Sequence, residues 1–158
     1  MSRAFVKEID DAPPPPPLER PVSGAPNLVT PRGARLIGEQ VAALEQAIVA
    51  AADEAAAAPL RRDLRYWLAR RASARPVAPD PAPEAAGFGA RVTIRRGGRE
   101  SVVEIVGEDE ADPDAGLIAW TSPLARALEE AEAGDMVELE AGGRTVPVTV
   151  LAVAPGSG

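Results

Sequence analysis

The chain has 158 residues, and 17 Lys and Arg against 24 Asp and Glu give it a formal net charge of −7. It contains no Cys and no His, which excludes disulfides, soft-metal sites, thiol nucleophiles and imidazole bases. The acidic balance argues against a protein that coats nucleic acid. Because no segment has the roughly 18 to 20 apolar residues of a membrane span, and the acids Glu8, Asp10 and Asp11 argue against a signal peptide, we expect a cytoplasmic protein.

Prolines divide the chain, which contains 17 of them. Residues 1–27 include five consecutive prolines at 13–17 and few large apolar side chains, so they are predicted to form a disordered, extended tail. We expect this tail to be a spacer, and the alternative is a ligand for a proline-binding domain. A second proline cluster predicts a linker over 76–86. Residues 28–75 and 87–154 then form two structured units.

The first unit, 28–75, has the pattern of a helical hairpin. Thr30-Pro31 is typical of a helix start, with a capping hydroxyl before a proline. Apolar residues then recur at alternating spacings of four and three, as in a coiled-coil seam, at Ile37, Val41, Leu44, Ile48 and Ala51. A matching stripe follows Pro59 at Leu60, Leu64, Trp67 and Ala74, with Arg71 at one seam position. We expect the connection near residues 53–58 and antiparallel packing.

The second unit, 87–154, has the pattern of a small sheet domain. Strands are expected at 91–95, 102–106, 117–120, 136–140 and 146–153. Two Gly-Gly pairs, at 97–98 and 142–143, predict hairpin turns. Ser122-Pro123 predicts a helix start, and the helix is expected to run to about residue 132. The fold class is therefore α+β, with an N-terminal antiparallel helical hairpin (a short coiled coil) and a C-terminal small β-sheet domain with one helix.

A basic stretch lies between the acidic parts of the chain, at Arg61, Arg62, Arg65, Arg70, Arg71 and Arg75. Arg61, Arg62 and Arg65 are candidates to contact RNA or an acidic protein surface, because guanidinium groups bind phosphate and carboxylate in a fork geometry. The alternative is a solvated face that balances the acids of the first helix. Within this stretch, Trp67 is expected to pack in the core.

An acidic loop follows the second predicted strand, with carboxylates at Glu108, Asp109, Glu110, Asp112 and Asp114. A calcium loop needs alternating ligands, a glycine at the sharp turn and a terminal bidentate acid, and this loop lacks that spacing. It is therefore interpreted as an interaction loop or a solvated loop. No intrinsic metal site and no intrinsic cofactor are expected.

Three strings in the second unit carry a family resemblance. They are FGARVT at 88–93, IVGEDEAD at 105–112, and SPLARAL at 122–128 followed by GDMV at 134–137. Together and in this order they resemble the GreA/GreB family of bacterial transcription elongation factors. The hairpin, with its entry LVTP at 28–31, is similar in pattern to the N-terminal arm of that family. The resemblance covers about residues 28–153.

The resemblance implies a coiled-coil arm and an FKBP-like C-terminal domain that docks on bacterial RNA polymerase at its secondary channel. In the docking region stand Trp120, Thr121, Ser122 and Pro123. The resemblance further implies that carboxylates at the arm tip help the polymerase hold its catalytic Mg²⁺ and cleave backtracked RNA, so the factor itself is not an enzyme. It implies a monomer that meets RNA and DNA only within the elongation complex and has no contact with a membrane.

The arm tip departs from the family. The family's tip pattern resembles Asp-x-Ser-Glu-Asn, whereas this chain has Asp53 and Glu54 followed by four alanines. These two acids either assist cleavage or form an ordinary solvated helix end. The arm is also shorter than usual, which resembles the Rnk-type relatives that bind polymerase without delivering acids to its active site. A third hypothesis is an FKBP-like prolyl isomerase, for whose aromatic pocket the domain offers only Phe88 and Trp120.

Overall fold

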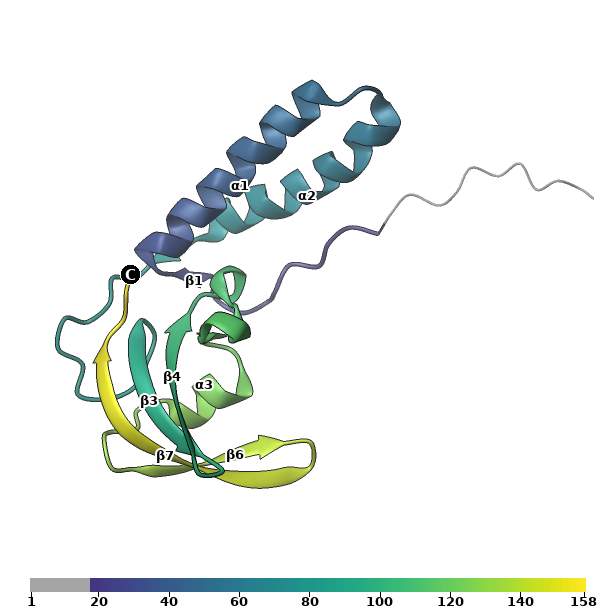
Figure 1. Ribbon diagram of the computed structural model, residues 1–158. Coiled ribbons are helices and arrows are strands. Elements are labelled where there is room, and N and C mark those ends of the chain that lie inside the picture. The colour runs from purple at the N-terminus through teal and green to yellow at the C-terminus, as the bar shows by residue number, and fades with distance from the viewer. Residues whose placement is uncertain (1–17) are drawn as a thin grey trace, which may run out of the picture.

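The computed structural model describes residues 18–158, so the proline run of the predicted tail lies outside the described residues. In the described part, a helical hairpin projects from a curled sheet domain (Figure 1). The hairpin consists of α1 (Pro31–Ala50) and α2 (Glu54–Ser73). At about 1.5 Å per residue, each 20-residue helix is about 30 Å long. The predicted α+β architecture, with a hairpin and a separate sheet unit, is confirmed.

The start of α1 follows the predicted capping chemistry. Thr30 Oγ1 accepts a hydrogen bond from Gly33 N, and Pro31 occupies the first helical position, where its missing N–H costs no intrahelical bond. Ile37 and Val41 are buried, and they pack with Trp67 of α2 in the small core of the hairpin. The alternating spacing of four and three therefore predicted the buried face of α1 correctly.

The turn of the hairpin is shorter than predicted. Residues 51–53 connect the helices, and residues 54–58, which were expected in the connection, are already helical. Asp53 caps α2 by accepting from Ala56 N at 2.8 Å, and the alanine tract has the highest helix propensity. Pro59 lies inside α2, so it does not restart the chain as predicted.

A correction also concerns the seam of α2. The seam position assigned to Arg71 was wrong, because Arg71 is exposed whereas the side chain of Arg70 is only 1% exposed. The predicted positions Leu64, Trp67 and Ala74 do pack in the core of the hairpin. Arg70 pairs with Asp109 and so points toward the sheet domain.

The sheet domain contains five strands in the order β5-β4-β3-β7-β6. Their bounds are β3 (Ala90–Arg96), β4 (Arg99–Val106), β5 (Leu117–Ala119), β6 (Met136–Ala141) and β7 (Arg144–Pro155). Within this five-stranded sheet, β4 and β5 pair in parallel and the other neighbours pair antiparallel. Both predicted Gly-Gly turns are present with positive φ at each glycine, between 56° and 76°, a conformation that glycine adopts without steric cost.

One face of this sheet is covered by α3 (Pro123–Leu128), whose Ala125 and Leu128 pack in the core with Val92, Ile94 and Val148. The helix ends four residues before the expected position. Glu130 has a φ of 63° and Ala131 N bonds the Leu128 carbonyl, so the chain turns back toward the core instead of continuing the helix.

Two short pairings hold the two ends of the predicted linker, 76–86. β1 (Leu28–Val29) and β2 (Arg75–Pro76) pair in parallel at the root of the hairpin. Further along, Ala85 forms a bridge with Glu132, and Ala86 is buried in the core of the sheet domain. The end of the predicted linker thus packs with the sheet domain. None of the helices within residues 18–158 has the length and hydropathy of a membrane span.

Candidate functional site

Three places in the structure contain the predicted site residues. They are the arm tip (residues 51–54), the outer face of α2 with its arginines, and the region from Trp120 to Pro123 beside α3. A fourth place, missed from the sequence, joins the hairpin to the sheet domain. We call it the joint, and it comprises Thr30, Arg70 and the short 3₁₀ helix η1 (Glu108–Glu110).

The arm tip brings the two predicted acids side by side at the start of α2. Asp53 is the N-cap, and Glu54, whose side chain is 74% exposed, forms an ion pair with Arg61. Around them the tip is apolar, with alanines at 50–52 and Val49 88% exposed. Among residues 18–158, no group of three or more potential metal ligands comes together. The tip thus offers two carboxylates, each with an intramolecular partner.

The three candidate arginines on α2 also have carboxylate partners. Arg61 pairs with Glu54, and Arg62 lies 3.4 Å from Asp63 Oδ1. Arg65 reaches a residue far away in the sequence, because its Nε lies 3.2 Å from Glu19 Oε2. The hydrogen bond from Arg65 holds the pKa of the Glu19 carboxyl below its ordinary value, and the pKa of Arg65 is raised in turn.

The region beside α3 begins with Trp120, which packs against the core of the sheet domain. Its backbone N–H donates to the Val106 carbonyl at 2.9 Å, whereas its indole Nε1 is buried without a hydrogen-bond partner. Thr121 Oγ1 lies 3.2 Å from Glu108 Oε1. Ser122 caps α3 by accepting from Ala125 N at 3.3 Å, and Pro123 is exposed at the first helical position. The predicted helix start is confirmed.

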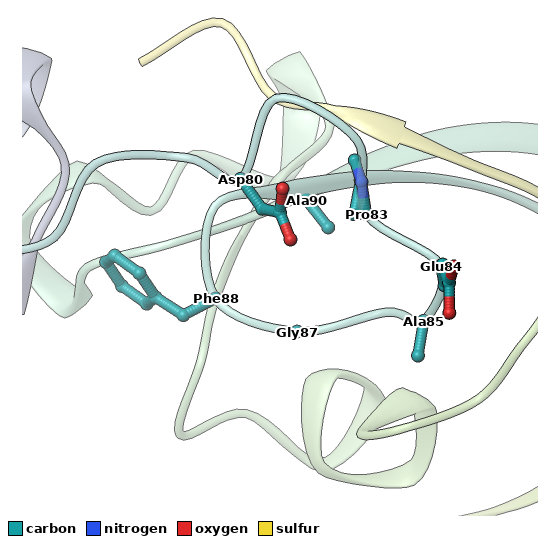
Figure 2. A pocket seen from close by; sticks show the side chains of 7 residues that line it. All are labelled: Asp80, Pro83, Glu84, Ala85, Gly87, Phe88 and Ala90. Carbon is teal, nitrogen blue, oxygen red and sulfur yellow. The ribbon is translucent and has the colours of Figure 1, made fainter.

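A pocket of about 320 Å³ lies next to this region. Its lining comes from the hairpin root, the loop before β3, β4 and the segment around α3, and consists of Leu28, Gly87, Phe88, Ile105, Trp120, Ala125, Arg126 and Glu129. The two aromatic side chains of the domain therefore share one pocket. A neighbouring pocket of about 300 Å³ is formed by the loop before β3, and its charged groups are Asp80 and Glu84 (Figure 2). The Phe88 ring points away from these two carboxylates (Figure 2).

At the joint, Glu110 holds the start of α1. Its Oε2 accepts from Thr30 N and from Gly107 N, both at 3.1 Å, and its Oε1 accepts from Thr30 Oγ1 at 2.5 Å. Arg32 lies 3.4 Å from the same oxygen, and the Glu110 side chain is 1% exposed. A buried carboxylate with several donors is compensated for its lost hydration.

Asp109 and Glu108 hold α2 from the same loop. Asp109 Oδ2 accepts from Arg70 Nε and its Oδ1 from the Tyr66 hydroxyl, each at 2.5 Å. Glu108 lies 3.4 Å from Arg70 and also contacts Thr121, so it links the joint to the predicted docking region. Burial, followed by the hydrogen bond to Asp109, raises the pKa of the Tyr66 hydroxyl.

Of the two interpretations of the acidic loop, the solvated loop was wrong for residues 108–110. Their carboxylates bind the hairpin, while Asp112 and Asp114 are exposed. One sequence signal for the joint was present. Gly33 lies in the first turn of α1 without a positive φ, and a Cβ there would stand 2.3 Å from Glu110 Oε2. A helical glycine of this kind indicates a close contact with another element.

Comparisons with known proteins bear on the sheet domain. Residues 81–155 match the family model described as "Transcription elongation factor, GreA/GreB, C-term". Transcription elongation factor GreB of Neisseria meningitidis serogroup A is 55% identical over 53 residues, which are 33% of this chain and 32% of that protein. GreA of Maricaulis maris is 39% identical over 71 residues, 44% of this chain and 45% of that protein.

Among solved structures, GreA/GreB from Nitrosomonas europaea is 23% identical, covering 80% of this chain and 98% of that one with a TM-score of 0.40. Gfh1 of Thermus thermophilus is 16% identical, covering 82% and 99%, also with a TM-score of 0.40. The chain thus matches less than half the length of these curated relatives, 32% of one and 45% of the other. Residues 81–155 are therefore similar to the C-terminal domain of the GreA/GreB family, as the three strings predicted.

Proposed function

We propose that this chain is a Gre-like transcription elongation factor that binds RNA polymerase at its secondary channel and regulates elongation. The observation that supports this most is the GreA/GreB C-terminal domain at residues 81–155. A hairpin about 30 Å long is attached to this domain through buried ion pairs and hydrogen bonds. In this proposal the domain docks through the region from Trp120 to Pro123, the arm reaches into the channel, and the chain has no enzymatic activity of its own.

Binding to core RNA polymerase by the full-length chain tests the docking step. Replacing Ser122 and Pro123 by alanine removes the cap and the preset φ of α3, together with the exposed ring at position 123, so we expect weaker binding. Ser101→Ala, at an exposed position of β4, is the control and should bind as the wild type does. Absence of binding at micromolar concentration of wild-type chain would exclude the proposal.

The proposal has two forms, which differ in whether the arm promotes RNA cleavage. In one form Asp53 and Glu54 help hold the Mg²⁺ of the polymerase and orient a water, since hard cations prefer carboxylate and water oxygens. The other form is a Rnk-like regulator without cleavage. The contacts at the tip favour the second form, because Asp53 caps α2 and Glu54 pairs with Arg61.

Release of short 3′ RNA fragments from stalled elongation complexes separates the two forms. Asp53→Asn with Glu54→Gln keeps the size of both side chains and the N-cap acceptor, while the charges are removed. If the arm promotes cleavage, we expect release to fall by about 10- to 100-fold or more, since even residues behind a metal ligand have effects of that size. Glu45→Gln, on the exposed face of α1, is the matched control. Fragment release by wild type at the intrinsic polymerase rate would establish the form without cleavage.

A further inference from the structure

The segment before the hairpin, residues 18–26, contacts the outer face of α2. The guanidinium carbon of Arg20 lies 3.8 Å from the centroid of the Tyr66 ring and 5.4 Å from that of Trp67. The two rings meet edge to face, with centroids 5.3 Å apart and an interplanar angle of 85°. A guanidinium within about 6 Å of an aromatic face is attracted by the ring's negative quadrupole.

The residue next to it adds a second contact. Glu19 pairs with Arg65, and both side chains are largely exposed, at 61% and 58%. Exposed ion pairs and exposed cation–π contacts are individually weak. The segment is therefore held by contacts that water and other charged groups can replace.

The three arginines of this face differ in where their partners come from. The carboxylates that pair with Arg61 and Arg62 are on α2 itself, at Glu54 and Asp63, whereas the partner of Arg65 is 46 residues away in the sequence. Glu19 thus occupies a position that a carboxylate from another molecule could take. The face of the adjoining Tyr66 ring would then be open to the same molecule once Arg20 leaves.

We propose that residues 18–26 form a displaceable strap, and that the surface beneath it, at Arg65 and the Tyr66 and Trp67 rings, binds an acidic peptide segment of the protein partner. This rests on the proposed function, in which that partner is RNA polymerase. A peptide fits because the present occupant is itself a peptide with one carboxylate at Arg65. A polyanionic RNA backbone needs a run of free guanidinium groups, and Arg61 and Arg62 already have carboxylate partners on their own helix.

The strap is tested first in the free chain. Since the chain contains no Cys, spin labels can be placed at Ser23→Cys and Ala69→Cys, both at exposed positions, and their distance measured by pulsed electron paramagnetic resonance. We expect a narrow distribution in wild type and a broad one after Glu19→Gln with Arg20→Ala. Glu39→Gln with Arg35→Ala, at exposed positions of α1, is the control and should leave it narrow. A distribution that the strap variant leaves unchanged would overturn the strap.

The docking face is tested by affinity for core RNA polymerase. Without the strap as competitor, the Glu19→Gln, Arg20→Ala variant should bind about two- to fivefold tighter, the size that a weak exposed contact allows. Adding Arg65→Gln to this variant should abolish the gain. An unchanged affinity would overturn the docking face, and so would a gain in affinity for a single-stranded RNA oligonucleotide alone. If no variant binds polymerase, the docking face fails together with the proposed function, while the distance distribution still decides whether the strap exists.

Discussion

The joint and the arm tip both place a carboxylate at the N-terminus of a helix of the hairpin, and the two carboxylates have opposite environments. At the joint, Glu110 is 1% exposed and accepts hydrogen bonds from Thr30 and Gly107. At the tip, Asp53 is exposed and accepts one bond from the third residue of its own helix. An acid at a helix start is favourable in both places, but only the buried one links two parts of the molecule. Substitutions at the joint should therefore have larger effects on stability than substitutions at the tip.

The largest effect is expected from Asp109→Ala, which leaves Arg70 buried without its closest partner and removes the acceptor of the Tyr66 hydroxyl. Breaking a buried ion pair typically lowers the free energy of unfolding by about 3 to 5 kcal/mol. Urea titration measures this free energy of unfolding. Asp114→Ala, at an exposed position of the same acidic segment, should change it by less than about 0.5 kcal/mol. Equal losses of stability for the two variants would contradict the buried ion pair between Asp109 and Arg70.

A smaller effect is expected from Gly33→Ala, because the added Cβ would stand 2.3 Å from Glu110 Oε2. Overpacking of this kind costs about 1 to 3 kcal/mol. Gly38→Ala in the same helix has nothing within 4 Å of the new Cβ, so it should raise stability by about 0.5 to 1 kcal/mol through helix propensity. The same urea titrations compare them. If both alanines stabilise the chain, the close approach of Glu110 to α1 does not exist in solution.

At the tip, Asp53→Ala removes the N-cap acceptor for Ala56 N and should cost about 1 kcal/mol. Asp53→Asn keeps an acceptor of the same shape and should be nearly neutral. Thermal unfolding of the three chains checks this. A cost for Asp53→Asn as large as for Asp53→Ala would show that the charge at the tip, and not the cap, is what matters there.

The smallest effect concerns the strap and its dependence on pH. The hydrogen bond from Arg65 lowers the pKa of the Glu19 carboxyl below its ordinary value of 4.5. The ion pair between Glu19 and Arg65 is therefore fully formed above pH 4.5, and it is lost as the pH falls through the lowered pKa of Glu19. The distance distribution between labels at positions 23 and 69 should broaden only below about pH 4.5. Glu19→Gln should remove this dependence. Broadening that begins near neutral pH would assign the transition to another group.

Local sequence patterns determined most of the elements. Thr30-Pro31 and Ser122-Pro123 predicted two helix starts, and the Gly-Gly pairs predicted both hairpin turns, because caps and positive φ angles depend on residues only a few positions apart. The three ordered strings of the sheet domain indicated a likeness to the GreA/GreB family, and residues 81–155 match the model of that family's C-terminal domain. For the tip, the sequence supplied Asp53 and Glu54 as candidates, whose role in cleavage stays a prediction.

Only the tertiary structure decided where the buried charges go. Arg70 meets Asp109 across 39 residues and Thr30 meets Glu110 across 80, and no periodicity in either segment specifies a partner at such a separation. The same charge pattern at 108–114 would suit a solvated loop if the hairpin lay elsewhere. The contact of the strap was also decided by the tertiary structure. The prolines before the hairpin predict an extended chain, but they do not predict that Arg20 lies over the ring of Tyr66. A carboxylate can be buried only where donors from other elements replace its water, and that arrangement exists only once the chain has folded.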